Sequence, residues 1–142
     1  MLLELLDGQQ PTEPAAFDAL CCWLKNCYAA LRQSYGTEMI LFDLHLRNFI
    51  WTGKKLYGVD FECVRPGKAE SDVGLLLAFL ATYTPAFTPE KLRLAAELYR
   101  KLTRELGLDA AIVQQETQSQ LAMIAARRNT VFESSKIQCI FS

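Results

Sequence analysis

Apolar residues with helical spacing occupy most of this chain and constrain its fold more than any other feature. Over residues 14–35 they recur at steps of three and four, the pattern of a helix with one buried face. The segments 72–83, 88–106 and 109–128 also have the composition and end signals of helices, and the first is apolar enough to be central. Residues 131–142 show no clear period. We therefore expect a mainly α fold.

A β-hairpin is the clearest strand signal in the sequence. Residues 48–51 read Asn-Phe-Ile-Trp, residues 52–54 form a Thr-Gly-Lys turn, and residues 55–59 return as Lys-Leu-Tyr-Gly-Val. The short apolar run at 38–42 is expected as a further strand, and the stretch that ends near Ser71 is expected as a polar loop. Since no segment supports a large sheet, the expected fold class is mainly α with a small β-hairpin.

Composition narrows the classes of partner. The chain has 142 residues, of which 51% are hydrophobic, enough for one domain with a core. Its formal net charge is −1, which argues against nucleic acid as a partner because proteins that bind it normally carry a basic surplus. No apolar run approaches the ~18 residues that span a bilayer, so no membrane partner is expected.

The cysteines form no recognisable metal or disulfide pattern. Five cysteines at irregular spacing include no Cys-x-x-Cys pair, and His45 is the only histidine. Neither a zinc site nor a disulfide framework is therefore expected. The leucine-rich N-terminus lacks the positive region of a signal peptide. Together these features favour a reduced, cytoplasmic setting.

Three aspartates and an asparagine follow one another in an order suited to chemistry on phosphate. Asp43 and Asn48 bracket a short loop, Asp60 comes twelve residues after Asn48, and Asp72 comes twelve residues later again. In phosphoryl transfer one carboxylate orients the acceptor hydroxyl and takes its proton. A second carboxylate and an amide oxygen hold Mg²⁺, which prefers oxygen ligands. A loop, a hairpin and a following aspartate would bring such groups together.

These segments resemble a known family. Residues 43–48, Asp-Leu-His-Leu-Arg-Asn, resemble the catalytic loop of aminoglycoside phosphotransferases and choline kinases, commonly His-Gly-Asp-Leu-His-x-x-Asn. Residues 59–62, Val-Asp-Phe-Glu, are similar to their metal-binding Asp-Phe-Glu/Asp, and residues 72–74, Asp-Val-Gly, to their Asp-Leu-Ala. Residues 3–8 resemble the hinge strand and its turn. The similarity covers roughly residues 2–106.

The resemblance implies a role for each of these residues. Asp43 would be the catalytic base, Asn48 and Asp60 the Mg²⁺ ligands, and Asp72 and His45 structural braces of the loop. The residues implied at the nucleotide base are Leu6, Ile50 and Val59. The implied fold is the C-terminal lobe of a protein kinase-like, aminoglycoside phosphotransferase-like fold. The implied cofactors are ATP and Mg²⁺, and the implied substrate is a small molecule with a hydroxyl group.

The sequence departs from the family pattern in two places. Leu41-Phe42 stand where the family has His-Gly. Residues 1–10 read as a hinge-like segment and 11–142 as the C-terminal lobe, with no N-terminal β-lobe and therefore no phosphate-covering loop or β-lobe lysine. This predicts a poor phosphotransferase as an isolated chain. A longer protein that was truncated, a missing lobe on a separate chain and a degenerate remnant would each explain the pattern. In each case we expect the chain to associate with itself or with a missing N-terminal lobe.

Other interpretations remain open at this point. The chain could be a non-catalytic, pseudokinase-like helical module that binds a partner. Asp43 and Asn48 could be turn residues, since both types favour turns, and Asp72 could be a plain helix cap. His45 could serve packing and hydrogen bonding alone. The pair Arg127-Arg128 reads as a solvated helix end.

Overall fold

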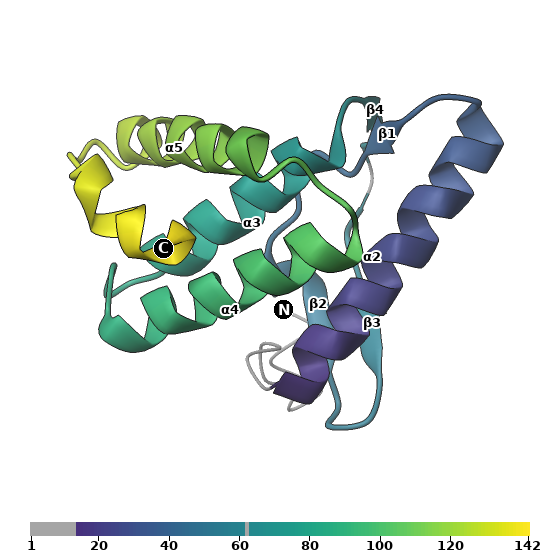
Figure 1. Cartoon of the computed structure of the whole chain (residues 1–142), viewed down its shortest axis with the longest axis horizontal. Coiled ribbons are helices and arrows are strands. Elements are labelled where there is room, and N and C mark those ends of the chain that lie inside the picture. The colour runs from purple at the N-terminus through teal and green to yellow at the C-terminus, as the bar shows by residue number, and fades with distance from the viewer. Residues whose placement is uncertain (1–13, 62) are drawn as a thin grey trace.

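Helix α3 (Ala69–Thr82) runs through the middle of the protein and is buried along nearly its whole length (Figure 1). Its sequence is apolar on all sides, which a helix tolerates only when neighbours cover every face. In this computed structural model, which describes residues 14–61 and 63–142, helices α4 (Pro89–Glu105) and α5 (Ala110–Arg127) supply that cover.

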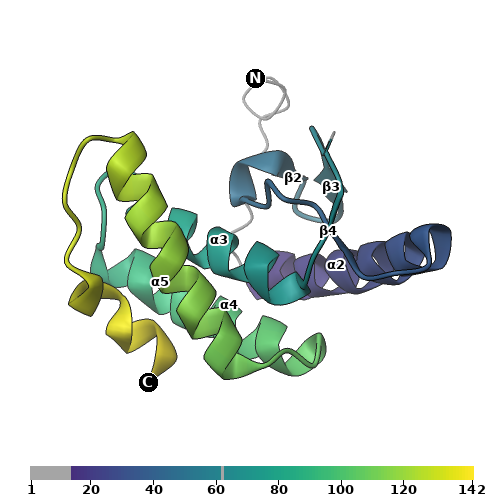
Figure 2. The same cartoon turned by 90° about the horizontal axis from the view of Figure 1, so that it is seen from above.

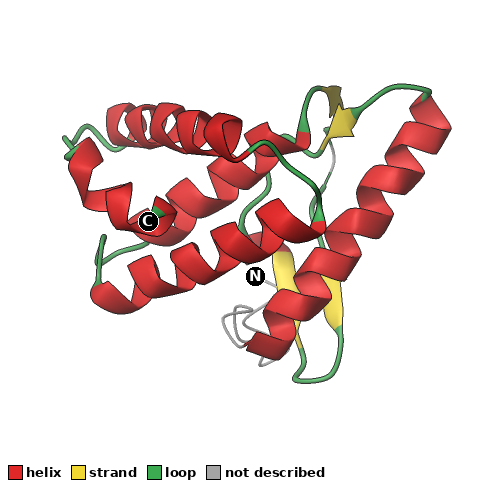
Figure 3. Ribbon diagram, viewed as in Figure 1, coloured by secondary structure: helices red, strands yellow, loops and turns green. Residues whose placement is uncertain are grey.

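Helix α2 (Pro14–Tyr35) precedes two small antiparallel sheets, and the chain ends in a 3₁₀ helix (Figure 3). The short elements are β1 (Met39–Ile40), η1 (Leu46–Asn48), β2 (Phe49–Trp51), β3 (Leu56–Gly58), β4 (Arg65–Pro66) and η2 (Ser134–Phe141). Strand β1 pairs with β4, and β2 pairs with β3. The helices thus dominate the described part of the chain.

Helices α3 and α5 run in the same direction (Figures 1 and 2). Helix α4, which lies between them in the sequence, runs in the opposite direction. The contact between α3 and α5 is the most extensive of the fold. Gly74 makes it possible, because a Cβ atom at this position would lie 2.7 Å from Cβ of Glu116 and 2.9 Å from its backbone carbon. The two helix backbones therefore approach one another at a point where no larger residue fits.

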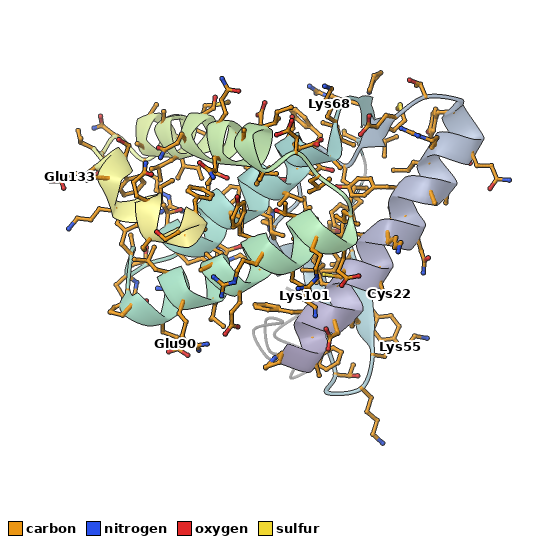
Figure 4. The ribbon with its side chains drawn as sticks, viewed as in Figure 1. Cys22, Lys55, Lys68, Glu90, Lys101 and Glu133 are labelled. Atoms are coloured by element: carbon orange, nitrogen blue, oxygen red, sulfur yellow. The ribbon has the colours of Figure 1, made fainter. Side chains whose placement is uncertain are left out.

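An aromatic cluster joins α2 to the hairpin. The Trp23 ring on α2 lies 5.0 Å from the Phe49 ring, edge to face, and 5.4 Å from the Phe61 ring. The same indole covers Gly58, where a Cβ atom would lie only 2.4 Å from it. The hairpin is thereby held against α2. Lys101 on α4, labelled in Figure 4, forms an ion pair with Asp18 that joins α4 to α2.

Most of the expected elements are confirmed. The coarse fold class, mainly α with a small β-hairpin, is correct, and the helix expected over 14–35 has those bounds. Helix α3 begins three residues before the expected position 72. The reason is tertiary: the carboxylate of Glu38 accepts a hydrogen bond from the Ala69 N–H at 3.3 Å and so caps this helix from a distant segment.

One expectation about an irregular segment was wrong, and one segment for which the sequence made no prediction has regular structure. The loop expected to reach Ser71 contains β4, whose Arg65 pairs with Ile40. A two-residue strand that includes a proline has no periodicity to detect. The tail without a clear period forms η2, in which Ile137 and Ile140 are buried. Their spacing of three matches the three-residue turn of a 3₁₀ helix.

The hinge-like segment 1–10, including Leu6, lies outside the described residues. Within the described part of the chain, no helix combines the length and the apolar content that crossing a membrane requires.

Replacing Gly74 by alanine tests the contact between α3 and α5. In an open helix this change stabilises by roughly 0.5–1 kcal/mol. Here the new methyl group would press on the backbone of α5, so Gly74→Ala should lower the free energy of unfolding by about 1–3 kcal/mol. Urea denaturation followed by circular dichroism measures it. Ser119→Ala on the exposed face of α5 is the control and should change it by less than about 0.5 kcal/mol. A Gly74→Ala variant as stable as the wild type would contradict the close approach.

Candidate functional site

The carboxylate of Asp72 organises the loop that follows β1. Asp72 lies in the first turn of α3 and is only 1% exposed. Its Oδ2 accepts a hydrogen bond from the Leu41 N–H at 2.8 Å, and its Oδ1 accepts one from the Phe42 N–H at 3.0 Å. One buried carboxylate therefore holds the two backbone amides that immediately precede Asp43.

A third donor reaches the same carboxylate from α2. The Tyr28 hydroxyl donates to Asp72 Oδ2 at 2.6 Å. Burial raises the pKa of the Asp72 carboxyl, and the hydrogen bonds from Tyr28, Leu41 and Phe42 offset part of that rise. The network joins α2, α3 and the loop. No signal in the sequence singled out Tyr28, because its helical spacing is that of an ordinary buried-face residue.

Asn48 closes the other end of the loop. Its Nδ2 donates to the backbone oxygen of Asp43 at 2.8 Å, and its own N–H donates to the His45 carbonyl at 3.0 Å. The Val59 N–H donates to the Asn48 carbonyl at 2.8 Å, which links this end of the loop to the hairpin. Asn48 is buried, and since Nδ2 is used on the loop, Oδ1 is the atom that its amide could offer to a cation.

Two residues of the site have left-handed backbone conformations. Phe42 has φ +70° and Asp60 has φ +62°. A bulky side chain at positive φ is strained and persists only where its surroundings determine it. For Phe42 those surroundings are the hydrogen bond to Asp72 and the Arg65 guanidinium, whose Cζ lies 3.7 Å from the Phe42 ring centroid. Phe42 therefore adopts a conformation that is more usual for glycine.

Asp43 and His45 lie side by side at the turn of the loop. The Asp43 side chain is 62% exposed, and its Oδ1 lies 3.5 Å from His45 Nε2. The pKa of His45 is lowered, mainly by burial and also by the nearby charge of Arg47. The Asp43 carboxylate offsets part of this decrease. The His45 ring packs edge-on against Phe79 of α3 at 5.3 Å between ring centroids. The histidine is thus held in place by packing, and the carboxylate beside it faces solvent.

Asp43 and Asp60 line the same cavity. It has a volume of about 510 Å³ and lies between the loop, the segment around Cys63 and Arg65, and helices α3 and α5. Asp72 forms part of its wall. Asn48 is not among the lining residues and acts on the loop through its hydrogen bond to the Asp43 carbonyl. The cavity therefore collects two of the three residues that the sequence predicted for chemistry.

Helix α5 contributes a wall that the sequence analysis missed. Glu116, Gln120, Met123 and Arg127 line the cavity at spacings of four, three and four residues, which is one face of a helix. The spacing is present in the sequence, but its mixed polar and apolar character resembles an ordinary solvated face. Only the packing of α5 beside α3 turns this face toward Asp43.

The residues predicted near a nucleotide base lie on the hairpin. Ile50 is 2% exposed, and Val59 is half-buried. Val59 therefore presents more surface to a ligand than Ile50 does. Leu6, the third residue of this set, lies outside the described residues.

The described residues contain no group of three or more His, Cys, Asp or Glu side chains that could hold a metal ion. The predicted Mg²⁺ site differs in kind, since it uses one carboxylate, Asp60, and one amide, Asn48. This donor set fits the ion, because Mg²⁺ commonly takes one or two protein oxygens and completes its shell with phosphate oxygens and water.

Comparisons of the chain with protein-family models, with curated proteins and with solved structures gave no match. The function is therefore inferred from the residues of the site and their geometry. The hydrogen bonds of Asp72 and the cavity shared by Asp43 and Asp60 are the two features that carry most weight.

Removing the Tyr28 hydroxyl should destabilise the protein at neutral pH. Tyr28→Phe leaves a buried carboxylate with one donor fewer, so the free energy of unfolding should fall by about 2 kcal/mol. Tyr35→Phe on the same helix is a matched control, because Tyr35 is exposed, and it should change the value by less than about 0.5 kcal/mol. Urea denaturation of the three proteins gives the comparison. Equal stability of both variants would show that the hydrogen bond to Asp72 contributes nothing.

Tyr28 should also make stability depend on alkaline pH. Burial raises the pKa of Tyr28 well above its ordinary value, and the neighbouring Asp72 raises it further. A raised pKa in the folded state means that the stabilisation is complete below about pH 10 and is lost as pH rises toward the folded pKa. Stability should therefore fall above pH 10 more steeply in the wild type than in Tyr28→Phe.

The control for this pH dependence is Tyr35→Phe, which should follow the wild-type slope. Burial raises the pKa of Tyr83 to about 12, so Tyr83 contributes an alkaline loss of the same sign to all three proteins. Denaturation curves at pH 9.5, 10.5 and 11.5 give the slopes. Identical slopes for wild type and Tyr28→Phe would refute the effect.

Proposed function

We propose that this chain is the C-terminal lobe of a kinase-like phosphotransferase that transfers the γ-phosphate of ATP to a hydroxyl group of a small molecule. The observation that carries the proposal is the loop 41–48. Its entry is held by Asp72, its exit is closed by Asn48 on the Asp43 carbonyl, and Asp43 faces the same cavity as Asp60. Positioning of this kind is most of the catalysis in phosphoryl transfer.

Asp43 is the proposed base. A base for this reaction must be within reach of a bound hydroxyl and must be ionised, and Asp43 is an exposed carboxylate at the edge of a cavity. The adjacent His45 is not among the residues that line the cavity, so Asp43 is the group of this pair that a bound hydroxyl would meet. The packing of His45 on Phe79 fits the bracing role that the sequence suggested.

Asp60 and Asn48 are the residues that would hold Mg²⁺, which when bound neutralises charge on the phosphates. Asp60, which has a left-handed backbone conformation, lines the cavity two residues after the end of β3. Asn48 does not line the cavity, and because its nitrogen is engaged with Asp43, its amide oxygen is the atom that it would offer to the ion. The two residues together supply the oxygen donors that the ion prefers.

A non-catalytic, pseudokinase-like interaction module is the second candidate. Two observations favour it: Asn48 is buried and does not line the cavity, and strained Phe42 precedes the proposed base. In that case the loop would be a rigid structural feature, and Asp60 would bind no metal–nucleotide complex. The two candidates differ in a single measurable property, which is binding of a metal–ATP complex.

Binding of Mn²⁺–ATP, with Mn²⁺ in place of Mg²⁺, tests the proposal directly. Electron paramagnetic resonance of Mn²⁺ should detect binding to the wild type at millimolar concentrations. Asp60→Asn should weaken it by at least about tenfold, or ~1.4 kcal/mol, because one of the two protein oxygens loses its charge. Asp43→Asn should change it by no more than about twofold, since a base is not a metal ligand.

Glu133→Gln is the matched control for the loss of one carboxylate. Glu133 points away from the helical body (Figure 4), and its side chain caps no backbone N–H group. This variant should bind Mn²⁺–ATP like the wild type. Absence of binding in the wild type, or equal binding in Asp60→Asn, would reject the proposal in favour of the interaction module. Phosphate transfer that persists in Asp43→Asn would reject Asp43 as the base.

A further inference from the structure

Two arginines of the cavity have no part in the chemistry proposed above. Arg65 comes from β4 and Arg127 from the last turn of α5. Among the described residues, neither forms an ion pair or a side-chain hydrogen bond, and each guanidinium lies over an aromatic ring. Arg65 Cζ is 3.7 Å from the centroid of Phe42, and Arg127 Cζ is 5.8 Å from the centroid of Phe79.

We propose that Arg65 and Arg127 bind an anionic group, a phosphate monoester or a carboxylate, of the acceptor molecule whose hydroxyl faces Asp43. The inference rests on the proposed function and extends it by naming the substrate class, a hydroxylated organic anion. A guanidinium stacked on a ring keeps its N–H donors in its own plane, where a fork of two donors matches two anionic oxygens. Both arginines therefore retain donors for a ligand.

The position of Arg127 relative to Asp43 suits one small molecule. The Asp43 carboxylate lies beside His45, the His45 ring packs on Phe79, and the Arg127 guanidinium lies over the same Phe79 ring. Phe79 is thus the floor between the proposed base and the arginine. An acceptor could place its hydroxyl at Asp43, its carbon chain over Phe79 and its anionic group at Arg127.

Among the described residues, the carboxyl groups that line the cavity do not pair with Arg65 or Arg127. Asp72 is saturated by three donors, and Asp43 and Asp60 face the reacting groups in the proposed function. The remaining acid, Glu116, is eleven residues before Arg127 on α5, which corresponds to ~16 Å along the helix. Arg127 therefore lies at the opposite end of the α5 wall from Glu116.

Two further arginines lie near the C-terminal end of α3 without lining the cavity. Arg47 Cζ lies 4.8 Å from the centroid of the Tyr83 ring, and Tyr83 stacks on Phe79. Arg128, by contrast, donates to the Thr82 carbonyl at 2.6 Å and so satisfies the C-terminal end of α3. The two arginines expected at a solvated helix end therefore have different roles. Arg128 stabilises the end of α3, and Arg127 lines the cavity.

Three small probes that differ in charge test the charge preference without nucleotide or turnover. Glycerol 3-phosphate carries hydroxyls and an anion, glycerol is neutral, and ethanolamine is cationic. Titrations at low salt, followed by amide chemical shifts in NMR spectra, should show glycerol 3-phosphate binding at least about tenfold more tightly than glycerol. Ethanolamine should bind no more tightly than glycerol. Arg127→Gln and Arg65→Gln should each lower the affinity for glycerol 3-phosphate several-fold.

Two controls remove one arginine without touching the cavity. Arg128→Gln changes the adjacent residue, and Arg93→Gln changes an exposed arginine that pairs with Glu97 on α4. Arg93→Gln, which keeps the fold intact, should bind glycerol 3-phosphate like the wild type, and Arg128→Gln should do so wherever its amide spectrum shows a folded protein. Equal binding of the three probes, or an equal loss in Arg93→Gln and Arg127→Gln, would overturn the proposal.

A last experiment distinguishes an anionic group of the acceptor from the phosphates of the nucleotide, since arginine could bind either of them. Mg²⁺–ATP added to the glycerol 3-phosphate complex should leave that probe bound if the site belongs to the acceptor. Competitive displacement would assign the arginines to the nucleotide and overturn the acceptor site. Because the probe titrations use no nucleotide, they succeed or fail independently of the Mn²⁺–ATP experiment on Asp60.

Discussion

The buried carboxylate of Asp72 is the interaction on which the rest of the structure depends. Removing a carboxylate from water costs several kcal/mol unless donors replace the water. Here the donors are one hydroxyl and two backbone amides from two distant segments, Tyr28 of α2 and the pair Leu41 and Phe42 after β1. All three donors are available only when α2, α3 and the loop have taken their native places.

The same carboxylate sets the geometry of the candidate site. Because it holds the amide of Phe42, that residue is kept at positive φ, and the chain turns sharply just before Asp43. Asn48 then closes the loop on the Asp43 carbonyl. The loop is thus defined at both ends by hydrogen bonds, so the exposed carboxylate of Asp43 is presented to the cavity before any ligand binds.

Helix α5 connects packing with the cavity. Gly74 lets α5 approach α3 closely at Glu116, and the two helices run in the same direction from there. This arrangement places Arg127 over the ring of Phe79, on the side where His45 packs. The wall that would contact an acceptor therefore depends on Gly74, which packs against Glu116, eleven residues before Arg127 in the sequence.

The sequence by itself determined the four helices and the hairpin. Apolar periodicity and turn residues are local signals, and the periodicity is reliable because each helix must bury one face. The order of Asp43, Asn48, Asp60 and Asp72 along the chain also made them candidate site residues, and the tertiary structure places three of them, Asp43, Asp60 and Asp72, around one cavity. Tertiary structure alone decided that Glu38 caps α3, that β4 pairs with β1, and that Tyr28 completes the Asp72 network. Each of these depends on contacts between segments far apart in the chain, and such contacts leave no periodic trace in the sequence.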